Sequence, residues 1–476
     1  MKRILLVTLL GLTVAGTATA AASQPNDTYI ARQWYLGRDH ALDTLDAAKQ
    51  LFTVRVAVID SGVELNHPEL RNRIVAHRSF VGGTVADTIG HGTFVAGEIA
   101  AIADNNAGIA GLAPPARLVV AKVVRDDGTI PPKAEAQAIR WAVRQGARVV
   151  NLSLGSTRDP SDPDVDGFSS VEQRAIQYAV RHGALVVAAA GNGNDAPQKP
   201  WPFASYPAAF PHVLAVGAYG RLGGVPSFSN RDDRLVDLSA PGMDIFSLFP
   251  RPLTAAFGAC IEQGYSSCGT KDYRHADGTS FAAPQVSAAA ALLFGESAAL
   301  RPDQVSEILK LNASDALPAN GCADCSVGPD ALTGFGRLDI SAALDSLQGP
   351  PPTADRFEPN DDAGSQAAIV WSPLVATATL DWWDDPNDVY RIHLDRGQRL
   401  SVYVRASSKI DPSIVLWKPG LQNLADARSD LRARRSIHGP GVPERIRFKA
   451  DRTAWYSLQV KLAKPGFGAY RIRLAF

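Results

Sequence analysis

The sequence predicts an α/β protein in which a mostly parallel sheet with helices on both faces precedes a small antiparallel β-sandwich. Two observations carry this prediction. Between residues 53 and 219, short β-branched runs alternate with segments of helical period, a pattern typical of a parallel sheet covered by helices. Beyond residue 356, apolar residues occupy every second position of several short runs, as expected for half-buried antiparallel strands.

The individual elements follow from the apolar spacing. The first predicted strand, 53–59, is almost wholly apolar, as a strand covered on both faces must be, and it runs into Asp60. The further predicted strands are 118–124, 149–154, 185–190 and 213–219, and the predicted helices are 94–103, 133–145, 171–182 and 286–294. Open parallel sheets bind ligands at the carboxyl ends of their strands, which makes Asp60 a candidate site residue.

The C-terminal segment begins with a stiff linker. Gly349-Pro350-Pro351-Pro352 is rich in residues that restrict the backbone. Strands of period two are then predicted at 390–394, 400–404, 456–462 and 470–476. The terminal Phe476 on such a strand is also a feature of outer-membrane barrels, but no other barrel strands are present, so we expect a β-sandwich.

Length, composition and net charge limit the possible domain organisation and partners. A chain of 476 residues with 46% hydrophobic content can bury one large core and that of a second domain. The formal net charge is zero, which argues against nucleic acid or an anionic membrane as a partner attracted by the whole-protein field.

The first 22 residues have the organisation of a secretory signal peptide. Lys2 and Arg3 precede the apolar run 4–14, and small residues follow up to Ala22. This run is too short to span a bilayer, and no later run is long and uncharged enough to do so. We therefore expect export, to the periplasm or outside the cell.

The four cysteines favour disulfides, because the chain is expected to leave the cytosol. Cys260 and Cys268 flank one short loop, and Cys322 and Cys325 close another. Among the three possible connectivities we expect these two local pairs. A zinc site built from all four residues is the alternative.

Three residues suggest a nucleophilic site. Ser280 precedes the apolar run 286–294, with Pro284 expected near the first turn of the helix; His91 in Gly90-His91-Gly92-Thr93 opens another apolar helix. A serine hydroxyl needs a base within reach and donors for the oxyanion that it creates. Each residue also has a plain explanation, Asp60 as a turn residue and the other two as helix caps. Together they give the order Asp, His, Ser of the subtilisin arrangement.

Longer motifs strengthen this interpretation. VAVIDSGVELNHPEL, GHGTFVAGEIAA, NLSLGS, VVAAAGNGN and DGTSFAAPQVSAAAALL resemble the signature blocks of the subtilisin-like serine peptidases, including thermitase-like members. The resemblance implies a subtilisin-like fold and a serine endopeptidase that forms an acyl-enzyme on Ser280. It implies Asp60, His91 and Ser280 as the catalytic triad and Asn192 as the side-chain donor of the oxyanion hole. Phe94 and Gln285 stand where histidines are common in the family, so we expect altered packing there.

The same resemblance implies substrate-binding positions. The two walls of the S1 pocket would be formed by Ser153, Leu154 and Gly155 on one side and by Ala189, Ala190 and Gly191 on the other. Between them lies the insertion 157–169, with four aspartates. It is either a solvated acidic loop or a rim that favours basic substrates. Tyr206-Pro207 falls where the family has a cis peptide bond.

The thermitase-like resemblance also implies a structural Ca²⁺ site around the loop 102–109. Its ligands would be Asp27, Glu69, Ile102, Asn105, Ala107 and Ile109, the last two and Ile102 through carbonyl oxygens. All-oxygen ligation suits Ca²⁺, although Asp104-Asn105-Asn106 is also good turn sequence. Glu69 stands where the family usually has a shorter aspartate.

A second resemblance concerns the C-terminal segment. FEPNDDAGSQA and LDWWDDPNDVYRIHLDRGQRLSV resemble the pre-peptidase C-terminal domain of secreted bacterial peptidases, which implies a removable accessory domain. The expected organisation is a signal peptide at 1–22, a peptidase domain at 23–348, a linker at 349–356 and a β-sandwich at 357–476. Asn26-Asp27-Thr28-Tyr29 already resembles the start of a mature enzyme, so we expect no pro-domain and cleavage near Ala20 to Ala22.

A catalytically silent binding protein that uses its β-sandwich is the alternative function. The presence of all four catalytic residue types favours the peptidase. A lipase-type esterase does not fit, because no G-x-S-x-G elbow surrounds Ser280 and the order of the triad differs. We expect a monomer acting on protein or peptide substrates.

Overall fold

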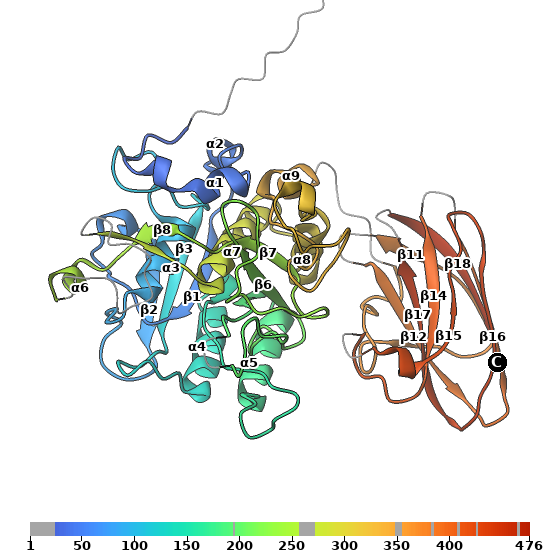
Figure 1. The fold of residues 1–476 in the computed structure, drawn as a ribbon. Helices are drawn as coiled ribbons and strands as arrows, with labels where there is room; N and C mark the ends of the chain where they lie inside the picture. The colour runs from blue at the N-terminus through green and yellow to red at the C-terminus, as the bar shows by residue number, and fades with distance from the viewer. Residues whose placement is uncertain are drawn as a thin grey trace, which may run out of the picture.

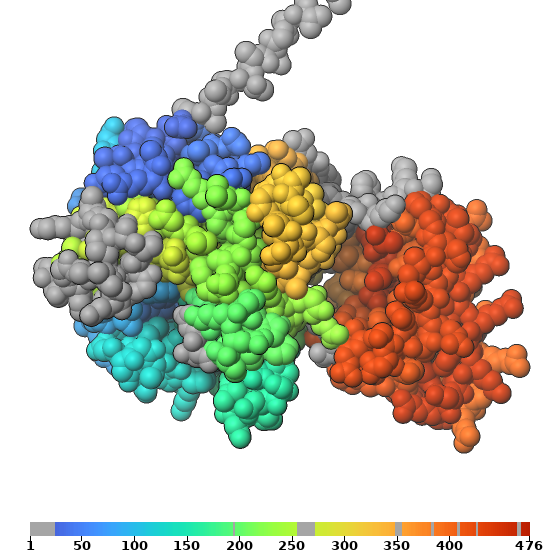
Figure 2. All heavy atoms as spheres, viewed as in Figure 1, coloured from blue at the N-terminus to red at the C-terminus, as the bar shows by residue number. Residues whose placement is uncertain are grey.

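The computed structural model describes residues 24–193, 196–256, 272–347, 355–381, 385–406, 410–424, 427–463 and 467–476. The described residues up to 347 form an α/β part, and a C-terminal β-sandwich lies beside it (Figure 1). In the space-filling view the sandwich is a distinct mass next to the larger α/β part (Figure 2). No helix among the described residues is both long and apolar enough to cross a membrane.

The centre of the α/β part is a seven-stranded sheet in the order β2-β3-β1-β4-β5-β6-β7, with every neighbouring pair parallel. Its strands are β1 (Val54–Asp60), β2 (Ile74–Ser79), β3 (Ala116–Lys122), β4 (Ala147–Leu152), β5 (Leu185–Ala189), β6 (Val213–Tyr219) and β7 (Leu238–Pro241). The five predicted strands are confirmed to within a few residues. The two edge strands, β2 and β7, were not predicted, because β2 has no fully buried residue and ends in three polar ones, and β7 has only four residues.

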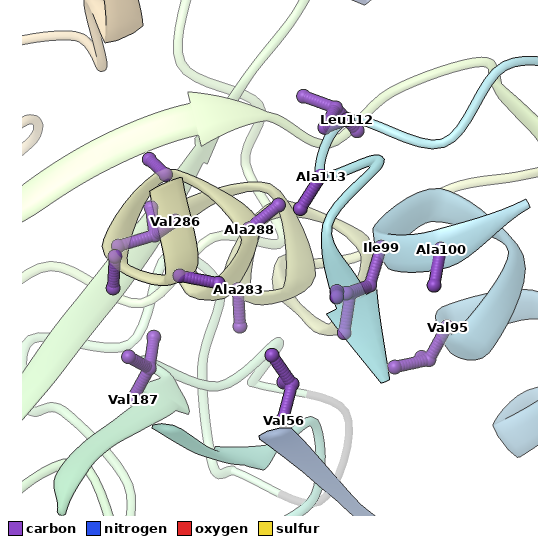
Figure 3. Close-up of a cluster of buried hydrophobic side chains, with 14 of the residues drawn as sticks. Val56, Val95, Ile99, Ala100, Leu112, Ala113, Val187, Ala283, Val286 and Ala288 are labelled. Carbon is purple, nitrogen blue, oxygen red and sulfur yellow. The ribbon is translucent and has the colours of Figure 1, made fainter. Parts of the chain in front are cut away.

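Four long helices cover the two faces of this sheet, as predicted. Helices α3 (His91–Ala100) and α7 (Thr279–Glu296) pack on one face, and α4 (Pro132–Arg144) and α5 (Ser170–Arg181) pack on the other. Alternate residues of β1 enter the two cores, Val56 and Val58 on the first side, Ala57 and Ile59 on the second. Figure 3 shows Val56 and Val187 of the sheet below Ala283 of α7.

Helix α7 is apolar on all sides and buried over almost its whole length, as a helix at the centre of a core must be. It begins at Thr279, earlier than the predicted apolar run. Pro284 is therefore the sixth helical residue and not part of the first turn. The expectation for Pro284 was wrong because the polar residues Thr279 and Ser280 belong to the helix itself.

The remaining elements complete the α/β part. They are η1 (Ile30–Arg32), α1 (Trp34–Arg38), α2 (Leu45–Ala48), η2 (Pro68–Leu70), β8 (Ile245–Leu248), α6 (Arg251–Ala256), β9 (Tyr273–Ala276), α8 (Pro302–Leu311), η4 (Pro318–Asn320) and α9 (Ile340–Asp345).

The C-terminal part consists of two packed sheets, ordered β10-β12-β17-β14-β15 and β11-β18-β13-β16. The strands are β10 (Ala368–Ile369), β11 (Leu374–Asp381), β12 (Asn387–Leu394), β13 (Arg399–Ala406), β14 (Pro412–Trp417), β15 (Arg432–Ser436), β16 (Glu444–Lys449), β17 (Ala454–Leu462) and β18 (Phe467–Ala475), with η6 (Ser429–Leu431) before β15. All neighbouring strands are antiparallel except β10 and β12. The predicted antiparallel sandwich is confirmed, and its core is built from inward residues such as Tyr390, Leu458 and Ile472.

The outward side of β13, β16 and β18 is strongly basic. We call it the arginine face, and its exposed members are Arg399, Arg405, Arg445, Arg447, Lys449, Arg471 and Arg473. The register places Arg405 opposite Arg471. The guanidinium groups of Arg445 and Arg473 lie 5.2 and 5.9 Å from the ring centre of Tyr403 between them. The one acid in these three strands, Glu444, is buried.

Candidate active site

His91 and Asp60 lie side by side where strand β1 ends and helix α3 begins. The Nδ1 atom of His91 is 2.8 and 3.0 Å from the two carboxylate oxygens of Asp60. Asp60 is buried and also accepts a hydrogen bond from the backbone N–H of Ser61 (2.6 Å). The carboxylate therefore keeps the proton of His91 on Nδ1 and leaves Nε2 as the ring atom that can act as a base.

Two opposing effects set the pKa of His91. Burial lowers it, but the charge and hydrogen bond of Asp60, with the charge of Asp87, outweigh burial and raise the pKa above its ordinary value of 6.5. The ring is therefore a stronger base than a free imidazole.

Asp87 supports this pair and was not predicted. Its Oδ1 accepts hydrogen bonds from the hydroxyl of Ser61 (2.8 Å) and the N–H of Gly90 (2.7 Å), and its Oδ2 accepts from the N–H and hydroxyl of Thr93 (2.8 and 2.7 Å). These contacts cap helix α3 and hold the turn that carries His91. An acid a few residues before Gly90-His91 is the capping signal that could have identified it.

Close backbone packing brings the first turn of α3 against strand β1. A Cβ on Gly92 would lie 2.2 Å from the carbonyl oxygen of Gly62 and 3.1 Å from the Cβ of Asp60. Only glycine permits this approach. The distance between Asp60 and His91 depends on it.

Ser280 is the second residue of helix α7 and is partly exposed. Its carbonyl oxygen accepts a hydrogen bond from the hydroxyl of Ser153 (2.6 Å). In a regular helix the N–H four residues later would fill this role, but that residue is Pro284, which has none. Ser153 in turn accepts from Nδ2 of Asn151 (2.9 Å), whose Oδ1 accepts from Ser287 (2.8 Å). This buried chain fixes the backbone of Ser280 to strand β4.

Phe281 places Ser280 near His91. The ring of Phe281 lies 5.3 Å from the ring of His91 and 4.5 Å from that of Phe94. Ser280 and His91 share no hydrogen bond in this structure. Gln285 donates to the carbonyl oxygens of Pro241 (2.8 Å) and Phe281 (2.7 Å). Phe94 and Gln285 thus pack around the site, as expected of these two substitutions.

Asn192 lies against the start of helix α7 with a fixed orientation. Its Oδ1 accepts hydrogen bonds from the backbone N–H (2.9 Å) and the hydroxyl (2.8 Å) of Thr279. A backbone N–H can only donate, so the atom facing it must be the amide oxygen. The Nδ2 group is therefore on the other side, 3.3 Å from the place that a Cβ on Gly278 would occupy. The amide nitrogen therefore faces away from Thr279, next to Gly278.

The predicted substrate-binding positions lie at one edge of the sheet, because β4 and β5 are parallel neighbours. Ser153, Leu154 and Gly155 follow β4, Ala189 is the last residue of β5, and Ala190 and Gly191 follow it. Gly191 has a φ of +104°, and a Cβ on it would lie 2.2 Å from the hydroxyl of Ser205. The peptide bond Tyr206–Pro207 is cis, as predicted.

Three aspartates of the insertion 157–169 accept hydrogen bonds from other residues of the same insertion. Asp159 accepts from the N–H and hydroxyl of Ser161 (2.9 and 2.6 Å), Asp166 from the N–H of Asp159 (3.0 Å), and Asp162 from the N–H of Asp164 (3.1 Å). These are the local bonds with which aspartate stabilises turns. The geometry favours a structured surface loop.

The structure brings together three of the predicted calcium ligands. Asp27 and Glu69 are buried, and Asn105 donates through Nδ2 to Glu69 (3.3 Å). Burial, opposed in part by hydrogen bonds from Asn105 and Tyr273, raises the pKa of Glu69 to about 7, and the charge of Asp27 adds to this. Ile102, Ala107 and Ile109 are on the same loop. Two buried carboxylates close to each other fit a hard divalent cation, whereas Asn105 turns Nδ2 toward Glu69 and its Oδ1 accepts from the N–H of Ala107 (2.8 Å).

Three of the expected features lie wholly or mostly outside the described residues: the signal peptide, 1–22, the pair Cys260 and Cys268, and the linker 349–356, of which only 355 and 356 are described. The sulfur atoms of Cys322 and Cys325 lie 1.94 Å apart, at disulfide distance. In the C-terminal part, a group not predicted as a site, Glu358, Asp385 and Asp388, places carboxylate oxygens within 4.8 Å of one another.

Comparison with known proteins identifies the family. Residues 53–336 match the model of the subtilase family. Thermitase of Thermoactinomyces vulgaris is 36% identical over 272 residues, 56% of this chain and 85% of thermitase, and subtilisin DY of Bacillus licheniformis is 34% identical over 61% of this chain and 90% of its own. A solved protease structure from Pseudoalteromonas arctica PAMC 21717 superposes with a TM-score of 0.54 at 28% identity, over 68% of this chain and 99% of that one. The chain belongs to the subtilase family of serine peptidases.

Proposed function

We propose that this serine endopeptidase is exported and cleaves peptide bonds through an acyl-enzyme on Ser280, with Asp60, His91 and Asn192 as the other catalytic residues. The observation that carries the proposal is the Asp60–His91 pair, which leaves Nε2 of His91 as a base beside the start of helix α7. A serine nucleophile also needs a hydrogen-bond donor for the oxyanion, and the ordered amide of Asn192 would supply it.

The proposed reaction has two steps, acylation of Ser280 and hydrolysis of the acyl-enzyme, and the same groups act in both. The oxygen of Ser280 attacks the scissile carbonyl carbon while Nε2 of His91 accepts the hydroxyl proton. Asp60 stabilises the imidazolium, and Nδ2 of Asn192 with the backbone N–H of Ser280 donates to the oxyanion. His91 then passes its proton to the leaving amine, and water hydrolyses the acyl-enzyme by the same route.

Substitution Ser280→Ala tests this function. The variant should fold normally but lose casein hydrolysis and labelling by phenylmethylsulfonyl fluoride, because no other side chain can form the acyl-enzyme. The matched control is Ser287→Ala in the same helix, which should keep labelling. Comparable turnover by purified Ser280→Ala would reject the assignment of the nucleophile.

Calcium is proposed as a structural ion of the peptidase domain, held by Asp27, Glu69 and Asn105 with the carbonyl groups of Ile102, Ala107 and Ile109. When bound, the ion would neutralise the two buried carboxylates and fix the loop 102–109 to the N-terminal segment. Removing it with a chelator should lower the thermal midpoint of the parent, since a ligand bound only by the native state stabilises it. The variant Asp27→Asn should be less sensitive to the chelator; equal sensitivity would place the ion elsewhere.

The remaining proposals concern processing and organisation. The chain is proposed to be exported after removal of 1–22 and to carry disulfides at Cys260–Cys268 and Cys322–Cys325. Its domains are proposed as 23–348 and 357–476, joined by the linker 349–356. The matched family region, 53–336, falls within the first of these domains. Resemblance of the sandwich to the pre-peptidase C-terminal domain supports a removable accessory role.

A further inference from the structure

We propose that Glu358, Asn360, Asp385 and Asp388 form a calcium-binding site in the C-terminal β-sandwich, separate from the site proposed in the peptidase domain. The residues come from two segments. Glu358 and Asn360 lie where the chain enters the sandwich after the linker, and Asp385 and Asp388 flank the start of strand β12.

Spacing of the oxygens fits one cation. Glu358, Asp385 and Asp388 each present a carboxylate oxygen, and these atoms lie within 4.8 Å of one another. Ca²⁺ binds oxygen at about 2.3–2.6 Å, so two ligand oxygens on opposite sides of one ion are separated by up to about 5 Å.

Asn360 provides an independent indication of a ligand. Its side chain is fully buried, and its Nδ2 donates to Oδ1 of Asp388 (2.6 Å). Its Oδ1, next to the carboxylates, is buried without a hydrogen-bond partner. Both carboxylate oxygens of Asp385 are also buried without a partner, on a residue that is 3% exposed. Buried polar atoms are rarely left without partners, and oxygens of this kind are the ligands that Ca²⁺ prefers.

Ion pairs do not neutralise the cluster, although the charge of Arg301 acts on Glu358. Within the described part of the chain, no lysine, arginine or histidine forms an ion pair with Glu358, Asp385 or Asp388. Buried like charges need a counter-ion or protons.

A shared proton fits this geometry less well than a metal ion. On helices α4 and α5, burial followed by the charge and hydrogen bonding of the adjacent Glu172 carboxyl raises the pKa of Glu135. The oxygens of Asp385 form no such bond. The sandwich thus has carboxylates spaced around a centre, whereas the helix pair has carboxyl groups in direct contact.

An ion at this position would connect the entry segment to both sheets. The second oxygen of Asp388 accepts from the hydroxyl of Tyr470 on β18 (2.5 Å), which is hydrogen-bonded to Tyr390 on β12 (2.6 Å). The backbone carbonyl of Asn360 accepts from Val389 of β12 (2.7 Å). Calcium binding should therefore stabilise the sandwich next to the linker.

The test uses the full chain with Ser280→Ala, to prevent self-cleavage, and Asp27→Asn, to weaken the site of the peptidase domain. Titration calorimetry with CaCl₂ should find about one Ca²⁺ per chain in this background. Adding Asp385→Asn should weaken this binding by about tenfold or more, because a charged ligand is lost. The matched control is Asp395→Asn, the same change at an exposed residue of the β12–β13 turn, which should bind Ca²⁺ like the background.

Stability gives a readout that a purely structural role of Asp385 would not produce. In EDTA, Asp385→Asn should raise the thermal midpoint of the sandwich, because it removes a buried charge; in Ca²⁺ it should lower the midpoint relative to the background, because it removes a ligand. Hydrogen exchange of β12 should slow with Ca²⁺ in the control but not in Asp385→Asn. If Asp385→Asn does not fold, Glu358→Gln at the partly exposed ligand serves instead.

The outcomes separate this proposal from the others. Loss of binding with an inverted stability effect supports the site. No Ca²⁺ binding in the Asp27→Asn background, or binding that neither Asp385→Asn nor Glu358→Gln weakens, overturns it. Peptidase activity of the parent is measured separately, so failure of this site leaves the proposed catalytic residues untouched.

Discussion

The hydrogen bond from Ser153 to the carbonyl oxygen of Ser280 should be essential because Pro284 cannot replace it. We consider Ser153→Ala in the Ser280→Ala background, where self-cleavage does not disturb unfolding measurements. The substitution leaves a carbonyl in the first turn of α7 without its 2.6 Å partner. It also removes the acceptor of Asn151 Nδ2, 2.9 Å away. Both groups are in the buried region between β4 and α7.

A buried polar group that loses its partner costs about 1–3 kcal/mol. The free energy of unfolding should fall by roughly this amount. For a domain of this size, each kcal/mol lowers the thermal midpoint by about 2–4 °C. Denaturant unfolding followed by circular dichroism measures the change directly.

The variant Pro284→Ala tests whether the loss of stability comes from the carbonyl group of Ser280. Alanine at this position has an N–H that can donate to the carbonyl of Ser280 four residues earlier. The cost of Ser153→Ala should therefore be smaller by about 0.5–1.5 kcal/mol when Pro284→Ala is also present. The matched control is Ser287→Ala, which removes a donor to Asn151 but leaves the carbonyl of Ser280 satisfied. Pro284→Ala should not rescue it.

Additive effects of Ser153→Ala and Pro284→Ala would refute the argument, since the two changes would then not act on one acceptor. Equal rescue of Ser287→Ala would refute it as well, because the gain would reflect a generally more stable helix.

Two further predictions concern catalysis. Asn192→Ala should reduce kcat by about 10²–10³-fold with little change in KM, since the amide acts on charge that develops in the transition state; steady-state kinetics on a peptide anilide checks this, and a change confined to KM would contradict it. His91 must be neutral to accept a proton, so kcat/KM should fall as the pH drops through its pKa, which Asp60 raises above 6.5 against the opposing effect of burial. In the residual activity of Asp60→Asn, the fall of kcat/KM should occur at lower pH. A fall at higher pH would contradict the statement that Asp60 raises the pKa of His91.

Local patterns predicted the fold because they depend on neighbours in the sequence. The apolar run before Asp60 and the helical period after His91 could be read directly. What the sequence could not show were the contacts between distant segments. The hydrogen bond from Ser153 to Ser280 spans 127 residues, and the role of Ser153 depends on the exact helical position of Pro284.

The acidic cluster escaped prediction for a similar reason. Glu358 and Asn360 are separated from Asp385 and Asp388 by strand β11, and each pair looks like ordinary turn sequence. Only the packing of the entry segment against β12 turns these surface residue types into buried ones. Asp87 was recognisable in principle as a helix cap, but its contact with Ser61 required the fold.

The arginine face changes what a net charge of zero means for this protein. The net charge determines the electric field only at long range. At physiological salt, counter-ions screen a single charge over a distance of about 8 Å. A surface that approaches β13, β16 and β18 therefore meets seven exposed cations, while the one acid of these strands, Glu444, is buried. At the pH where it does not migrate in an electric field, the protein should still adsorb to a cation exchanger. It should do so through the arginine face of its sandwich.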